Sequence, residues 1–213
     1  MTRVENIINV LNQMYPDAHV ELTHKNNFEL LVAVVLSAQT TDISVNKVTP
    51  NLFLKYPTVQ ALSVASIEDV IYIIKTIGLY RNKSKNIIEL AKVLVEKYNG
   101  QVPSDRKSLE ALPGVGRKTA NVVLSNAFGI PALAVDTHVA RVSIRLGLAK
   151  KNDNVLEIEK KLNRKIPKAY WTKIHHQFIF FGRYHCLAKN PKCNQCPLYD
   201  ICKYEDKNKY KNL

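Results

Sequence analysis

The chain has 213 residues, 46% hydrophobic content and a formal net charge of +13. A chain of this length buries a core of its own, as one compact unit or as two small domains. It contains no apolar run of about eighteen residues and no leader with a small-residue cleavage site, so we expect a cytoplasmic monomer with no membrane span.

The positive charge is concentrated in the C-terminal part of the chain. Residues 1–133 hold 14 Lys and Arg against 11 Asp and Glu, whereas residues 134–213 hold 17 against 7. An excess of this kind favours a polyanionic partner, with nucleic acid first and an anionic membrane surface second.

Apolar residues recur at three- and four-residue spacing along almost the whole chain, and no alternating run predicts a sheet. The fold class is therefore predicted to be all-α. We expect Ser66 and Asp69 to form a capping box, Asn99-Gly100 to end a long helix, and Asp136 to occupy an N-cap. The expected helices, in chain order, cover residues 4–11, 28–36, 66–74, 81–98, 106–112, 117–128, 137–146, 155–164 and 168–181.

A tight hairpin, Leu112-Pro-Gly-Val-Gly-Arg-Lys118, joins two of these helices. Gly114 and Gly116 allow main-chain N–H groups to approach a ligand, and the next helix points its positive dipole end at the same place. The hairpin is therefore a candidate phosphate site that would grip a DNA backbone without reading sequence. The alternative is a plain turn between helices.

Two side chains near this hairpin are candidates for chemistry. Lys118 lies beside Arg117 and close to a helix N-terminus, where neighbouring positive charge favours the neutral, nucleophilic amine. Such an amine can attack a sugar C1′ and form a Schiff base that permits strand cleavage by β-elimination. Asp136 could stabilise positive charge on the sugar or accept a proton. Their ordinary roles would be a solvated lysine and a helix cap.

All four cysteines lie in one segment with the spacing Cys186-x6-Cys193-x2-Cys196-x5-Cys202. Disulfides are disfavoured in the cytoplasm, and a thioredoxin-type site would need a βαβ unit. Four thiolates can bind zinc or a [4Fe–4S] cluster, and the spacing leaves both open.

Together the hairpin segment 112–123, the segment Val135-Asp136-Thr-His-Val139 and the cysteine spacing closely resemble the endonuclease III family of helix-hairpin-helix DNA glycosylases. The likeness covers essentially the whole chain. Ser37-Ala-Gln-Thr-Thr-Asp42 and Gly78-Leu-Tyr-Arg-Asn-Lys83 also resemble that family's segments, in the same order. One departure is Thr40, where the family frequently has alanine, and we do not expect it to change the reaction.

The resemblance implies a two-domain helical fold. A six-helix domain with the helix-hairpin-helix motif would cover residues 21–132, and residues 1–20 with 133–213 would form an iron–sulfur cluster domain. It implies a bifunctional glycosylase and abasic-site lyase of base excision repair, acting on oxidised pyrimidines in double-stranded DNA and associated with the nucleoid.

The resemblance also assigns residues. Lys118 would be the catalytic amine, Asp136 the catalytic carboxylate, and the four cysteines the ligands of a [4Fe–4S] cluster. Gln39 and Leu79 would enter the gap left by a flipped nucleotide, where they would offset lost stacking. The further DNA contacts would come from Leu112, Gly114, Gly116, His138, Lys189 and Lys192.

Two other functions compete with this one. An adenine-type monofunctional glycosylase shares the fold and cluster but lacks the lysine nucleophile and carries an extra C-terminal domain. A non-catalytic DNA-binding module would use the cysteines for zinc and the hairpin only to hold phosphate.

Overall fold

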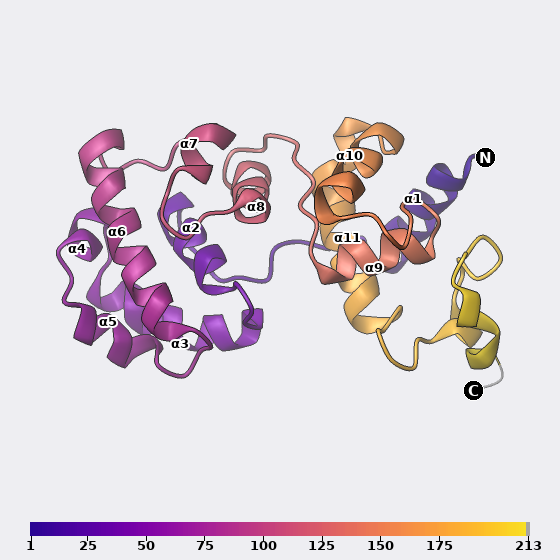
Figure 1. Ribbon diagram of the computed structural model, residues 1–213, viewed down its shortest axis with the longest axis horizontal. Coiled ribbons are helices and arrows are strands. Elements are labelled where there is room, and N and C mark those ends of the chain that lie inside the picture. Colours follow the sequence, from indigo (N-terminus) through magenta and orange to yellow (C-terminus); the bar gives the residue numbers. More distant parts are fainter. Residues whose placement is uncertain (212–213) are drawn as a thin grey trace. The chain divides into compact units, whose positions relative to one another are not determined.

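The computed structural model describes residues 1–211, which form α-helices, short 3-10 helices and connecting loops without a β-strand (Figure 1). The prediction of an all-α fold is confirmed. None of the helices in residues 1–211 is long and apolar enough to cross a membrane. The chain divides into two compact units, residues 21–130 and residues 1–20 together with 131–213.

The unit of residues 21–130 is built around a buried helix, α2. Every residue of α2 from Phe28 to Leu36 is buried, including Glu29, and α2 contacts α3, α6 and α8. The helices of this unit are α2 (Asn27–Leu36), α3 (Asp42–Lys55), α4 (Val59–Ser63), α5 (Ile67–Ile74), α6 (Tyr80–Tyr98), α7 (Arg106–Glu110) and α8 (Arg117–Ala127).

One of the predicted helix ends is formed as the local sequence indicates, and one predicted cap is not. Helix α6 ends as expected, because Asn99 and Gly100 adopt left-handed backbone conformations and the Gly100 N–H donates to the Leu94 carbonyl oxygen at 2.8 Å. The capping box expected at Ser66 is wrong. The Asp69 carboxylate pairs with Lys55 at 2.8 Å, and the Ser66 hydroxyl donates to Glu68 instead.

Helices α3 and α4 were not expected from the sequence. Helix α3 contains Pro50 in its interior, a residue that normally ends a helix because it lacks an N–H donor. The helix continues because Val45, Val48 and Leu52 bury one face in the core. Tertiary packing therefore outweighs the local penalty.

The unit of residues 1–20 and 131–213 has its own core, which includes Leu11, Val139, Val142, Phe178 and Phe181. Helix α11 contacts both α1 and α9, and α9 contacts α10. The helix expected over 168–181 begins as a 3-10 turn and continues as α11 to Tyr184. The elements are α1 (Arg3–Met14), α9 (Thr137–Arg145), α10 (Val155–Lys165), η1 (Lys168–Tyr170), α11 (Trp171–Tyr184), η2 (Cys193–Gln195) and η3 (Glu205–Tyr210).

Candidate active site and metal centre

The hairpin between α7 and α8 contains two glycines with different roles. The backbone conformation requires glycine at position 114, whereas Gly116 leaves the surface at the start of α8 uncovered. Gly114 has φ +78, and a Cβ there would lie 3.0 Å from Asn86 Cβ and 3.2 Å from Val35 Cγ1. Gly116 has an ordinary φ of −96° and no atom within 4 Å of such a Cβ. Gly114 makes the turn possible, and Gly116 leaves the start of α8 accessible.

Gly116 is the N-cap residue of α8, and no side chain caps this end. The N-cap residue itself therefore offers no side-chain acceptor to the first N–H groups of the helix, which carry the positive end of the helix dipole. The side chain of Leu112 is only 3% exposed and packs in the core. The DNA contact expected of Leu112 stays a prediction, and the burial of its side chain leaves the main chain of the hairpin as the part that can make it.

Lys118 is the second residue of α8, and its side chain is exposed. Its neighbours Thr119 and Ala120 are buried, so the helix anchors the lysine while its amine stays in solvent. No ion pair holds the amine among residues 1–211. This arrangement leaves the amine accessible to a large substrate such as a DNA strand.

Asp136 is the N-cap of α9, as expected. Its Oδ1 accepts the backbone N–H of Val139 at 2.8 Å, and the residue is half-buried. Capping uses this one carboxylate oxygen, so the cap role leaves the second oxygen available for chemistry.

His138 lies in the first turn of α9 and is half-buried. Its Nδ1 lies 3.1 Å from Arg141 Nη2, which also donates to the Gly182 carbonyl oxygen at 2.7 Å. Burial lowers the pKa of His138. The nearby Asp136 carboxylate raises this pKa, whereas Arg141 and Arg183 lower it further. The imidazole is thus favoured in its neutral form, which limits it to hydrogen bonding rather than ion pairing with phosphate.

The four cysteines are unpaired and half-buried, on the segment that follows α11. Burial raises the pKa of the Cys196 thiol to about 11. For Cys193, burial and then the neighbouring Cys186 and Cys202 raise the pKa. A bound metal centre would displace the protons of these thiols, because metals bind the thiolate form.

The donor set is chemically suited to a thiolate-ligated centre. Four sulfurs and a single carboxylate, Asp200, lie on one short segment, and a set dominated by thiols favours zinc or iron–sulfur binding over magnesium or calcium. Within residues 1–211, no group of three or more His, Cys, Asp or Glu side chains is arranged so that it could hold a metal ion. His185 stacks on Phe181 with ring centres 5.1 Å apart, which supports a packing role for it.

Two arginines that sequence analysis did not single out hold this cysteine segment to α9. Arg145 donates from Nη1 to Cys186 Sγ at 3.3 Å and to the Leu187 carbonyl oxygen at 2.6 Å. Arg141 donates from Nε to the Cys186 carbonyl oxygen at 3.1 Å. The only sequence signal is their four-residue spacing on a predicted helix, which brings both side chains to one face.

The other expected DNA contacts are surface residues. Gln39, Leu79, Lys189 and Lys192 are all exposed, with Leu79 at 53%. Leu79 is therefore not part of the core. Gln39 and Leu79 also have left-handed backbone conformations, with φ of 53° and 58°, which are unusual for side chains of this size.

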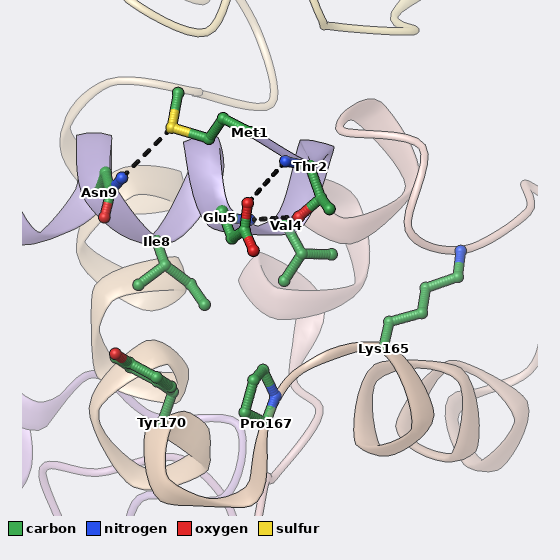
Figure 2. A pocket seen from close by; sticks show the side chains of 9 residues that line it. All are labelled: Met1, Thr2, Val4, Glu5, Ile8, Asn9, Lys165, Pro167 and Tyr170. Carbon is green, nitrogen blue, oxygen red and sulfur yellow. Dashed lines mark hydrogen bonds between the residues drawn. The ribbon is translucent and has the colours of Figure 1, made fainter.

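Two hollows of the described surface are lined by other residues. Figure 2 shows one between α1 and the segment around Pro167, where Glu5 closes the capping box of α1. A second hollow lies beside the start of α2. The side chains lining the first are Met1, Thr2, Val4, Glu5, Ile8, Asn9, Lys165, Pro167 and Tyr170.

Comparisons with known proteins match nearly the whole chain. Residues 32–168 match the model of the HhH-GPD superfamily base excision DNA repair proteins, and residues 186–202 match the iron–sulfur binding domain of endonuclease III. Endonuclease III of Bacillus subtilis (strain 168) is 53% identical over 213 residues, which cover 100% of this chain and 97% of the relative. Endonuclease III of Escherichia coli (strain K12) is 48% identical over 201 residues, which cover 94% and 95%.

Two solved structures are similar over their full length. A trapped endonuclease III–DNA covalent intermediate has a TM-score of 0.93 and 54% identity, covering 98% of each chain. A non-covalent endonuclease III–DNA complex has a TM-score of 0.94 and 53% identity, covering 100% of each chain.

Proposed function

Because the chain belongs to the endonuclease III family of the HhH-GPD superfamily of base excision DNA repair proteins, we propose that Lys118 and Asp136 perform its chemistry. The protein is a DNA glycosylase with abasic-site lyase activity, its partner is DNA, and it carries a [4Fe–4S] cluster. The monofunctional glycosylase and the zinc-containing binding module are set aside.

The exposed amine of Lys118 is the observation that carries the proposal. The neutral amine attacks C1′ of the damaged nucleotide, the bond from C1′ to the base breaks, and the base leaves with the bonding electron pair. Loss of the amine proton and opening of the sugar ring convert the adduct into a Schiff base. Removal of a C2′ proton then expels the 3′-phosphate by β-elimination, and water releases Lys118.

Asp136 supplies the negative charge that these reaction steps need. Its free carboxylate oxygen stabilises the positive charge that develops on the sugar as the base departs, and it accepts the proton that the amine gives up. Its other oxygen stays on the Val139 N–H, so the helix cap fixes the carboxylate during the reaction. Because Asp136 is half-buried, water weakens the interaction between its carboxylate and the positive charge less than it would at a fully exposed position.

DNA binding uses backbone groups and surface charge. The uncapped N–H groups at the start of α8, made accessible by Gly116 and the Gly114 turn, hold a phosphate. Lys189 and Lys192, exposed between the first two cysteines, add sequence-independent attraction. Neutral His138 accepts the Arg141 N–H at Nδ1, so its Nε2–H donates a single hydrogen bond to a phosphate oxygen of the DNA backbone.

Gln39 and Leu79 fill the gap left by the flipped nucleotide. Extrusion of a base costs a few kcal/mol of stacking and pairing, and side chains that enter the gap offset part of this cost. Both side chains are exposed, as this role demands.

Cys186, Cys193, Cys196 and Cys202 hold the cluster, which when bound cross-links the segment 186–202 through four Fe–S bonds. Arg145 and Arg141 connect this segment to α9, whose N-cap is Asp136. The two compact units correspond to the helix-hairpin-helix domain and the cluster domain. The enzyme acts as a monomer at the nucleoid, on oxidised pyrimidines and abasic sites.

The test is reductive trapping. The wild-type protein and Lys118→Ala are incubated with duplex DNA that carries one oxidised thymine or one abasic site, borohydride is added, and covalent complexes are separated on a denaturing gel. Wild type traps and Lys118→Ala does not. Lys107→Ala, an exposed lysine on neighbouring α7, is the matched control and traps as wild type does. Trapping by Lys118→Ala would exclude Lys118 as the nucleophile.

A further inference from the structure

Two loops of the unit 21–130 share an unusual backbone feature. Four residues other than glycine have positive φ among residues 1–211, and two of them are asparagines, which tolerate this conformation. The other two are Gln39 and Leu79, for which the left-handed conformation is sterically unfavourable. Such conformations persist where the surrounding structure enforces them, and they cluster at functional sites.

The two loops lie against each other. A Cβ placed on Gly78 would be in van der Waals contact with the Gln39 loop, at 3.7 Å from the Gln39 carbonyl oxygen and 3.8 Å from Thr40 Oγ1, so the two segments are neighbours. Gly78 directly precedes Leu79, and Thr40 directly follows Gln39. The exposed side chains of Gln39 and Leu79 therefore project from adjoining backbone segments.

A buried lysine joins these loops. Lys83, in the first turns of α6, is 4% exposed, and its Nζ donates to Thr40 Oγ1 at 2.6 Å. The Thr40 hydroxyl in turn donates to the Ala38 carbonyl oxygen at 3.4 Å. Burial lowers the pKa of Lys83, and no ion pair of this amine is found within residues 1–211. A buried ammonium without a carboxylate is rare in folded proteins and needs a specific acceptor.

We propose that Lys83 and Thr40 form a positioning link that holds the Gln39 loop against the Leu79 turn, so that both side chains enter the DNA together. The inference rests on the proposed role of Gln39 and Leu79 in filling the gap. Lys83 is a positioning residue in this scheme and does not touch the reacting atoms.

The link is tested with a duplex that has 2-aminopurine opposite a non-cleavable abasic analogue. The fluorescence change at saturating protein reports the insertion of side chains next to that base. We expect Thr40→Ala and Lys83→Met to reduce the change as much as Gln39→Ala does, and to slow single-turnover excision of an oxidised pyrimidine by about tenfold. Thr40→Ser keeps the hydroxyl and restores the wild-type signal. Lys85→Met, an exposed lysine on the same helix, is the control.

Thermal denaturation separates positioning from stability. Lys83→Met removes the buried charge, so this variant keeps the wild-type melting temperature although it loses the fluorescence change. Thr40→Ala leaves the buried Lys83 ammonium without its acceptor, so this variant has a lower melting temperature. A wild-type signal in Thr40→Ala and Lys83→Met, beside a reduced signal in Gln39→Ala, overturns the link. Wild-type signals in Gln39→Ala and Leu79→Ala overturn the proposed gap-filling role instead.

Discussion

Arg145 Nη1 donates a hydrogen bond to Cys186 Sγ over 3.3 Å, which ties helix α9 to the first cysteine of the cluster segment. The same guanidinium donates to the Leu187 and Ala188 carbonyl oxygens at 2.6 and 3.2 Å and lies 3.9 Å from the centre of the Tyr204 ring. Its own backbone carbonyl accepts the Lys203 N–H at 2.7 Å. One residue thus fastens both ends of the cysteine segment.

Replacing Arg145 by leucine should destabilise the cluster domain. The change leaves two carbonyl oxygens and the Cys186 sulfur without their donor, and the cost is about 3 kcal/mol because the side chain is only 8% exposed. We expect a lower melting temperature and a lower iron-to-protein ratio, measured by denaturation and metal analysis. Arg164→Leu, an exposed arginine on α10, is the control and should retain its iron. Full iron content in Arg145→Leu would contradict this role.

Substitutions at Asp136 should separate capping from catalysis. Asparagine caps a helix about as well as aspartate, so Asp136→Asn should change stability by less than about 0.5 kcal/mol, whereas Asp136→Ala should cost about 1 kcal/mol. Both remove the carboxylate charge and should slow base excision about a hundredfold or more. Melting temperatures and single-turnover rates distinguish the two effects. An Asp136→Asn variant with wild-type rate would leave only the cap role.

The two hairpin glycines should respond differently to alanine. Gly114→Ala forces a side chain into φ +78 and within 3.0 Å of Asn86 Cβ, so we expect a loss of about 2 kcal/mol of stability or more. Gly116→Ala meets no atom within 4 Å and should keep the melting temperature. Its methyl group shields the N–H groups of α8, so affinity for DNA should fall while the salt dependence of binding persists. Unchanged affinity would argue that phosphate is held elsewhere.

Stability should fall in mild acid because of His176. Burial lowers the pKa of His176 from 6.5 to about 3, with smaller contributions in the same direction from His175 and His19. The folded state therefore keeps His176 neutral, whereas the unfolded chain takes up a proton below about pH 6.5. Above that pH, His176 does not affect the free energy of unfolding. Between about pH 6.5 and pH 3, its protonation in the unfolded chain lowers the free energy of unfolding by about 1.4 kcal/mol for each pH unit.

The measurement is the denaturation midpoint at several pH values from 7.5 to 5. We expect the midpoint of the wild-type protein to decrease with pH more steeply than that of His176→Leu, because the variant takes up one proton fewer on unfolding. His24→Gln, a half-buried histidine in the other compact unit, is the control and should follow the wild-type curve. Parallel curves for wild type and His176→Leu would assign the pH dependence to other groups.

Local patterns in the sequence were enough for the features that depend on neighbours along the chain. Helical periodicity predicts α6 and its end at Asn99, and a polar residue before an apolar run predicts the Asp136 cap. The grouping of all four cysteines within one short segment predicts the metal centre without any knowledge of packing. These features are local because hydrogen bonds within a helix, caps and ligand spacing act within a few residues.

Only the tertiary structure decided which side chains are buried and which distant residues meet. Leu112 and Leu79 are both leucines next to turns, yet one is 3% and the other 53% exposed. Asp69 forms an ion pair with Lys55 and does not cap its helix with Ser66. Lys83 donates a hydrogen bond to Thr40, which lies 43 positions away in the sequence. The reason is physical: a contact between remote segments depends on how whole helices pack, and the free energy of that packing exceeds the local preferences that a sequence displays.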